Sequence, residues 1–157
     1  MQAYGVSGPM DGLPDPERDA QFYDGVPARR LAAWVIDALV VLAVGVPIAV
    51  LFGLITLGFG FALFPMFLIG VSFLYRTTTI AGRSATWGMR AFGLELRRSD
   101  GTRFDFVTAA LHTLIYNVCF SVIVLQAISC AAMAGTRYGQ GIPDIILRTT
   151  AINAPAD

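Results

Sequence analysis

Asp37 is the only charged residue between Arg30 and Arg76, in a stretch that is otherwise uncharged and mainly apolar. An ionised side chain near the middle of a membrane helix costs roughly 2.5–3.5 kcal/mol on insertion scales, so it usually faces protein or water. A carboxylate there either makes a polar contact that holds helices together or binds and releases a cation or proton. The sequence leaves both uses open, and it makes Asp37 the first candidate for a functional site.

Arg30 lies seven residues before Asp37, which on a helix puts both on nearly the same face, about 10 Å apart along the axis. A guanidinium at the end of a span normally extends toward the lipid headgroups, away from the membrane centre. We therefore do not expect a direct salt bridge between these two side chains. Bridging water, or an acidic partner for Arg30 from elsewhere in the fold, is expected instead.

Catalytic chemistry finds little support in the sequence. All 11 basic residues are arginine, so mechanisms that use a lysine Schiff base or a lysine general base are excluded. The glycines at positions 82, 88, 93 and 101 lack the spacing and the Lys-Ser/Thr pair of a phosphate-binding loop. There is also no nucleophile elbow, no catalytic dyad and no paired set of metal ligands. We expect a protein that is not an enzyme and has no cofactor and no metal site.

The composition is that of an integral membrane protein. Of the 157 residues, 55% are hydrophobic and 14% are charged, and the mean hydropathy is +0.64. A soluble domain carries about 25% charged residues. The formal net charge is zero, so the chain has no overall basic field that would attract nucleic acid.

Two apolar spans are expected in the N-terminal half. Residues 1–28 are rich in Gly, Pro and Asp, which predicts a disordered tail without a cleavable signal peptide. The apolar run 31–75 is about twice the roughly 20 residues that one crossing needs, so it predicts a transmembrane hairpin. Glycines at positions 53, 58 and 60 mark the turn and give spans of about 31–52 and 57–75.

The distribution of arginine predicts the orientation of these spans. Six arginines lie in residues 76–106 and three in the N-terminal tail, whereas the hairpin turn has none. The positive-inside bias therefore predicts that the N-terminus and the loop 76–106 are cytoplasmic. Each arginine near the surface would add about 1 kcal/mol of attraction to anionic lipid. Within this loop a short two-stranded β-ribbon is expected near Leu94 to Phe104.

A third apolar segment covers residues 106–135 and contains His112, Asn117 and Gln126 but no charged side chain. It predicts either one tilted span of about 107–134, with the C-terminus outside, or an interfacial helix near 104–117 followed by a shorter buried segment. We interpret His112 as a hydrogen-bonded or interfacial residue rather than a proton relay. Residues 151–157 are expected to form a C-terminal tail.

Three blocks of the sequence carry a family resemblance. The first is Arg30-x-x-Ala33-x-x-x-Asp37, the second runs from Thr86 through Gly88 and Gly93 to the turn Asp100-Gly101, and the third is Gln140-Gly141-Ile142-Pro143-Asp144. With these blocks the chain resembles the RDD family of small bacterial membrane proteins, named for one arginine and two aspartates. The resemblance extends over most of the chain.

The resemblance implies which residues to examine. It makes Arg30, Asp37 and Asp144 the name-giving trio, a candidate ion or proton site, with secondary candidates at His112, Thr86, Gly88 and Gly93. The chain departs from the family pattern at three positions. Met89 and Pro143 stand where a lysine and a histidine are common, and His112 stands where an arginine often opens the third apolar segment.

Together these features predict an all-α polytopic membrane protein with a transmembrane helical hairpin, a basic cytoplasmic loop and a third apolar helical segment. The resemblance suggests a transport-related role in which the trio couples a cation or proton. An accessory or scaffold subunit of a larger membrane complex is the alternative. Three spans are too few to enclose a pathway alone, so transport would require a homo-oligomer, whereas a scaffold would not.

Overall fold

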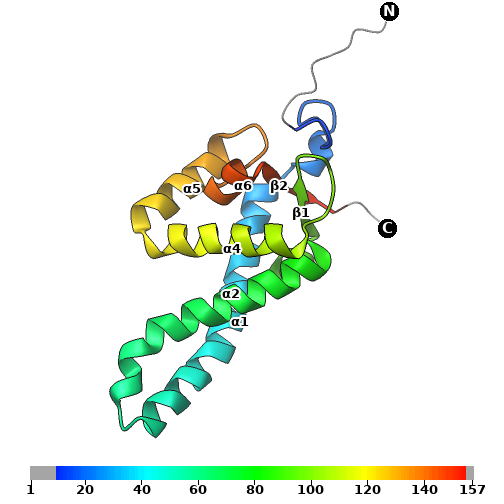
Figure 1. Ribbon diagram of the computed structural model, residues 1–157. Helices are drawn as coiled ribbons and strands as arrows, with labels where there is room; N and C mark the ends of the chain where they lie inside the picture. The colour runs from blue at the N-terminus through cyan, green and yellow to red at the C-terminus, as the bar shows by residue number, and fades with distance from the viewer. Residues whose placement is uncertain (1–9, 155–157) are drawn as a thin grey trace, which may run out of the picture.

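The computed structural model describes residues 10–154 of the chain, and most of them are helical. A long antiparallel hairpin extends away from a more compact part that contains the other elements (Figure 1). Helix α1 (Val26–Ile55) and helix α2 (Phe64–Arg83) form the hairpin, with the short 3-10 helix η2 (Phe59–Leu63) between them. Both helices are long and apolar enough to cross a membrane, as expected for the run 31–75.

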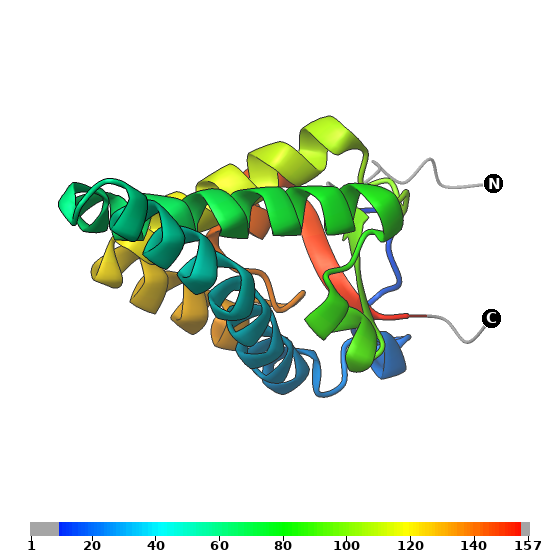
Figure 2. The same cartoon turned by 90° about the horizontal axis from the view of Figure 1, so that it is seen from below.

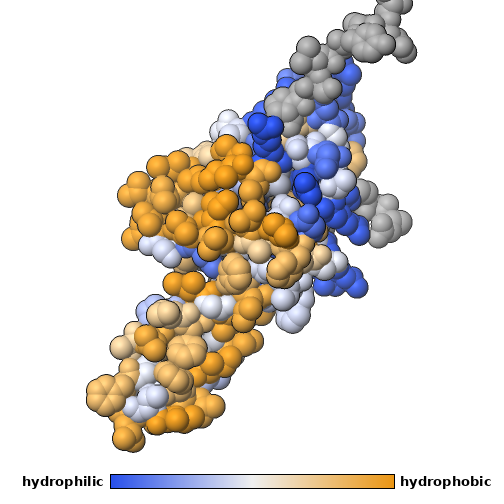
Figure 3. Space-filling view, in the orientation of Figure 1, coloured by the Kyte–Doolittle hydropathy of each residue, from blue (hydrophilic) through white to orange (hydrophobic). Residues whose placement is uncertain are grey.

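Large apolar side chains are exposed along both helices of the hairpin (Figure 3). Leu39, Leu51, Ile55, Met66 and Leu74 are all more than half exposed. A continuous exposed apolar surface of this kind marks contact with a membrane or a partner rather than with water. The exposed apolar surface of the hairpin is therefore what its length and hydropathy lead one to expect of helices that cross a membrane.

The arginine-rich segment after α2 folds into helix α3 (Trp87–Ala91) and strand β1 (Leu94–Arg98). Thr86 caps α3, because its hydroxyl accepts the Met89 N–H at 3.1 Å. Gly93 follows the helix with φ at +64°. Glycine adopts this left-handed conformation without strain, and so it permits the tight turn from α3 into β1.

The sheet differs from the expected ribbon in its second strand. β1 pairs antiparallel with strand β2 (Thr149–Asn153), with Leu96 opposite Ala151. Within the expected ribbon, only Arg103 makes an isolated bridge, to Arg97 of β1. Pairing with the C-terminal strand is favoured because it buries Leu96 and Ala151 in the core. The C-terminal tail expected from residue 151 is thus a strand as far as residue 153.

The third apolar segment is two helices instead of one. Helix α4 (Phe106–Ser121) and helix α5 (Ile123–Gly135) meet at Val122, whose extended backbone breaks the helix, and their directions differ by 118°. α5 therefore folds back beside α4 (Figure 1). A short helix, α6 (Ile142–Leu147), follows and packs on α4. The expected single span over 107–134 is broken in its middle.

The N-terminal residues from position 10 are folded, in contrast to the expected disordered tail. They make turns and the 3-10 helix η1 (Ala20–Phe22). The Gly12 N–H donates to the Ser99 carbonyl at 2.9 Å, and the Tyr23 hydroxyl donates to the Pro14 carbonyl at 2.9 Å. The first bond attaches the segment to the rest of the protein, and the second holds the segment together. Residues 1–9 of the expected tail lie outside the described residues.

Three parts of the chain that are distant in sequence meet at one end of the molecule (Figure 2): the N-terminal segment, strand β1 and strand β2. The Asn153 side-chain amide donates to the Gln21 carbonyl at 2.8 Å and so joins β2 to the N-terminal segment. One buried core is shared by the start of α1, the end of α2 and strand β1. It includes Val26, Ile80 and Leu94. We call the assembly of residues 10–25, 84–105 and 136–153 the polar cap.

Candidate functional site

Asp37 is 1% exposed, and its carboxylate accepts three hydrogen bonds from neutral groups. The Tyr75 hydroxyl donates to Oδ1 at 2.7 Å, the Thr86 hydroxyl donates to Oδ2 at 2.7 Å, and the Gly88 N–H donates to Oδ1 at 3.0 Å. The donors come from α2, from the cap residue of α3 and from the first turn of α3. Asp37 therefore joins the hairpin to the first helix of the polar cap.

Arg76 supplies the positive charge at this site. Its Nη1 lies 3.5 Å from Asp37 Oδ2, and its Cζ lies 4.3 Å from the centroid of the Tyr116 ring. A guanidinium over an aromatic face is attracted by the ring quadrupole. The Trp34 indole N–H donates to the Tyr116 hydroxyl at 2.7 Å. Tyr116 of α4 thus contacts both the cation on α2 and the indole on α1.

Position 88 requires a glycine because α3 and α1 are in close contact there. A Cβ atom at this position would lie 2.2 Å from the Ala33 carbonyl oxygen and 2.8 Å from Asp37 Oδ1. The first of these atoms is backbone and cannot move aside easily. The absence of a side chain therefore allows the Gly88 N–H to reach the carboxylate.

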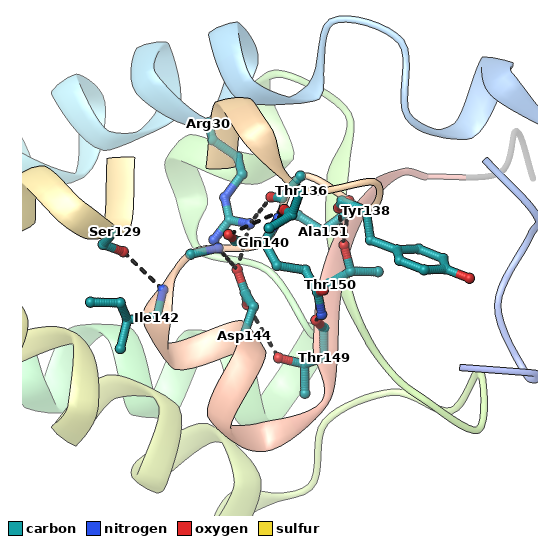
Figure 4. A network of polar contacts seen from close by, with 12 residues as sticks. Arg30, Ser129, Thr136, Tyr138, Gln140, Ile142, Asp144, Thr149, Thr150 and Ala151 are labelled. Atoms are coloured by element: carbon teal, nitrogen blue, oxygen red, sulfur yellow. Dashed lines mark hydrogen bonds and ion pairs between the residues drawn. The ribbon is translucent and has the colours of Figure 1, made fainter. Parts of the chain in front are cut away.

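Asp144, on α6, is fully buried and lies in a second polar site (Figure 4). Arg30 Nη1 lies 2.7 Å from Oδ2, and His112 Nε2 lies 2.9 Å from Oδ1. The Thr149 hydroxyl donates to Oδ1 at 3.2 Å, and the Gly141 N–H donates to Oδ2 at 3.1 Å. Asp144 therefore joins α1, α4, α6 and β2.

Neighbouring bonds hold this second site in place (Figure 4). The Gln140 side-chain amide donates to the Thr149 carbonyl at 2.6 Å, and the Ile142 N–H donates to the Ser129 hydroxyl at 3.0 Å. Burial by itself raises the pKa of the Asp144 carboxyl, but the Arg30 guanidinium and His112 outweigh that effect and hold the pKa below its ordinary value. The carboxylate is therefore the favoured form at neutral pH.

The predicted trio is divided between the two sites. Arg30 bonds to Asp144, which is the acidic partner from elsewhere in the fold, while Asp37 is paired with Arg76. The secondary candidates are divided as well: the Asp37 site contains Thr86 and Gly88, the Asp144 site contains His112, and neither contains Gly93.

Sequence reasoning missed Tyr75 and Arg76. Both lie at the end of the second apolar run, and Arg76 is the first charged residue after it. An antiparallel hairpin places the beginning of its first helix beside the end of its second. That geometry was a signal that Asp37, near the start of α1, has neighbours near the end of α2.

A cavity of about 480 Å³ lies between α1 on one side and α4 and α5 on the other. Its wall is mostly apolar, but both polar sites contribute to it. Arg30, Asp37, Arg76 and His112 are among the residues that line it. The cavity therefore connects the two sites through one shared space.

Comparison with known proteins agrees with these features. A model of the RDD family matches residues 25–148, which include both buried aspartates and the helices around the cavity. No curated protein and no solved structure matches the chain. The family match and the two span-like helices together indicate a membrane protein. The chain is thus a member of the RDD family.

Proposed function

We propose that the protein is a polytopic inner-membrane protein in which only α1 and α2 cross the bilayer fully. The support is the antiparallel pairing of β1 with β2. Strands joined by hydrogen bonds lie on the same side of a membrane, and a full crossing by α4 and α5 between them would separate them. In this topology the α4–α5 pair enters the membrane and returns to the side from which it came. Met10 and Ala154, the first and last residues that the structure describes, both lie on the side of the polar cap.

The polar cap faces the cytoplasm in this proposal. The support is the position of the arginines, since all eleven lie near or within the cap and none lies at the hairpin turn. Residues of the arginine-rich segment would then lie close to the headgroups of anionic lipids.

Labelling from outside the cell tests this topology. In a background without native cysteines, Phe59→Cys at the hairpin turn should react with a membrane-impermeant maleimide in intact spheroplasts. Asp100→Cys in the cap and Ala154→Cys after β2 should react only after the membrane is opened. Reaction of Ala154→Cys in intact spheroplasts, without reaction of Asp100→Cys, would contradict the proposal.

We assign the protein the role of an accessory or scaffold subunit of a larger membrane complex, without catalysis or transport of its own. This proposal rests on one observation: both carboxylate oxygens of Asp37 already accept hydrogen bonds from donors of the protein itself. A carboxylate that couples to a moving cation must exchange its partners. Asp37 instead accepts three hydrogen bonds from the protein itself and lies beside Arg76.

Cation- or proton-coupled transport is the second candidate, and one observation favours it. Arg30, Asp37, Arg76 and His112 all line the same cavity, so their charges are accessible from a common space. Two crossings and a returning helical pair cannot enclose a pathway, so this function requires a homo-oligomer.

Thermal stability and size distinguish the two candidates. Wild type and Asp37→Asn are purified in detergent, sized, and unfolded at several pH values in sodium, potassium and lithium salts. For the accessory role we expect Asp37→Asn to be less stable by the same amount in all three salts. A stabilisation of wild type by one cation that Asp37→Asn lacks would overturn this proposal and support transport.

A further inference from the structure

We infer that the cavity between α1, α4 and α5 binds the acyl chain of a lipid, with an oxygen of its head as the hydrogen-bond acceptor. This inference holds for either candidate function, because it depends only on the shape and lining of the cavity. The ligand class includes free fatty acids and the acyl esters of membrane lipids. These two sources share an apolar chain that ends in a carbonyl or carboxylate oxygen.

The size and the walls of the cavity suit an apolar chain. Its volume of about 480 Å³ lies within the range of about 300–1,000 Å³ that is typical of ligand pockets. The wall includes Ile80 of α2, Cys119 of α4 and Met133 of α5. Apolar surface of this kind is more stable against a hydrocarbon chain than against water.

Two polar atoms in this cavity lack partners. Of the residues that the structure describes, only three carry a fully buried side-chain nitrogen or oxygen without a hydrogen bond, and two of them line the cavity. These are Arg76 Nε and Thr113 Oγ1. An unsatisfied buried donor costs about 1–3 kcal/mol. We expect an acceptor oxygen on the ligand head to bond to Arg76 and to Thr113 once their side chains turn toward the cavity.

Arg76 is the guanidinium with donors available for this contact. Arg30 is held at 2.7 Å by Asp144, whereas Arg76 lies 3.5 Å from Asp37. The Asp37 oxygens are already bonded to Tyr75, Thr86 and Gly88. The head of a bound lipid therefore has its best partner at Arg76.

The rim of the cavity is apolar and exposed. Leu31 of α1 is 65% exposed and Phe120 of α4 is 49% exposed, and both line the cavity. The surface over α4 and α5 is strongly apolar (Figure 3). A rim of this character lies against lipid hydrocarbon, so the nearest source of ligand is the bilayer itself.

Tryptophan fluorescence provides a direct test, because Trp34 lines the cavity and Trp87 does not. These are the only two tryptophans in the chain. In the Trp87→Phe variant, in detergent, 9,10-dibromostearic acid should quench Trp34 saturably, and unbrominated stearic acid should reverse the quenching. In Trp34→Phe, the remaining Trp87 should show only weak quenching that does not saturate. Equal quenching of the two tryptophans would overturn the inference.

Two threonines give a matched pair of variants for the head contact. Thr113 and Thr77 both carry a buried hydroxyl without a partner, but only Thr113 lines the cavity. In the Trp87→Phe background, Thr113→Val should raise the dissociation constant of dibromostearic acid at least fivefold, and Thr77→Val should leave it unchanged. Equal effects of the two substitutions would contradict the proposed head contact.

A variant at the edge of the cavity tests occupancy without altering the core. Ala134 is exposed and lines the cavity, so Ala134→Phe should obstruct it and abolish the saturable quenching while the protein stays folded. Saturable quenching that persists in Ala134→Phe would overturn the inference. The methyl ester of dibromostearic acid distinguishes the two sources: equal affinity indicates an esterified lipid, and weaker affinity indicates a free fatty acid.

Discussion

The two buried aspartates differ in the kind of donor that surrounds each one. Asp37 accepts three hydrogen bonds from neutral groups, and its guanidinium partner, Arg76, lies 3.5 Å away. Asp144 has a guanidinium at 2.7 Å and an imidazole at 2.9 Å. Both carboxylates accept hydrogen bonds from neutral groups, but Asp144 also makes a direct ion pair with Arg30, whereas the cation beside Asp37 lies farther away.

The sites also differ in how much of the chain they connect. Asp37 joins α1 to residues 38–51 positions later, in α2 and α3. Arg30 and Asp144 are 114 positions apart and join the first helix to the C-terminal part of the polar cap. We conclude that the Asp144 site closes the cap, while the Asp37 site fixes α3 on the hairpin.

The largest expected effect comes from removing Arg30. Arg30→Met leaves Asp144 buried without its cation, and losing one partner of a buried ion pair costs about 3–5 kcal/mol. Arg76→Met should cost less than half as much, because Arg76 lies 3.5 Å from Asp37 Oδ2, whereas Arg30 lies 2.7 Å from Asp144 Oδ2. Denaturant titration in detergent micelles measures both free energies of unfolding.

A double variant controls for the size of the side chain. Arg30→Met combined with Asp144→Asn removes both charges and should recover part of the stability that Arg30→Met alone loses. Equal losses for Arg30→Met and Arg76→Met would contradict the contrast between the two sites.

The next effect is expected for Asp37→Asn. The substitution keeps the shape of the side chain but presents an amide N–H₂ where Thr86 or Gly88 donates a hydrogen bond. Hydrogen bonds to a charged group contribute about 1.5–3 kcal/mol each, so we expect a loss of about 2 kcal/mol in the same titration. An increase in stability would mean that the desolvation of the carboxylate exceeds these bonds, and it would favour a role in ion or proton binding.

A smaller effect is expected for Gly88→Ala, which tests whether α3 must touch α1. The added Cβ would lie 2.2 Å from the Ala33 carbonyl oxygen, and overpacking of this kind costs about 1–3 kcal/mol. Gly82→Ala in α2 is the matched control, because nothing lies within 4 Å of a Cβ at that position. That substitution should be neutral or stabilising by about 0.5–1 kcal/mol. Similar destabilisation by both would show that helix propensity, and not close approach, explains the glycine.

Local signals in the sequence predicted the hairpin and singled out Asp37, whereas the other candidate residues came from the family resemblance. Apolar runs indicated the hairpin, because a run of that length must cross a membrane or bury itself. The resemblance to the RDD family pointed to Thr86 and Gly88, and both contact Asp37. Such features depend on residues close in sequence or on hydropathy, which a single chain displays directly.

Contacts between distant residues were not predictable in the same way. Strand β1 pairs with residues about 55 positions away, and nothing local distinguishes that partner from the nearer residues around Phe104. No glycine or proline marks the break at Val122. The division of the trio also depends on tertiary packing, because only the folded cap shows that Asp144 reaches Arg30.

The smallest effect is expected at an exposed aspartate, which provides a reference for the two buried ones. Asp105 caps α4, and its side chain is 58% exposed. The Thr108 N–H donates to its carboxylate at 2.7 Å, and this bond, together with the charge of Arg98, holds the pKa below its ordinary value. A lowered pKa contributes stability that is complete above the ordinary value and is lost as the pH falls through the lowered one.

The amide resonance of Thr108 reports this capping bond directly. In wild type its chemical shift should change with a midpoint below the pKa of about 3.9 that an unperturbed aspartate has. Asn is a comparable cap at neutral pH, so Asp105→Asn should leave α4 intact and remove the titration. A midpoint at or above the ordinary value would show that the exposed bond contributes nothing. Since solvent screens this charge, a clear shift here would imply that the same kinds of donor act more strongly on the buried Asp144.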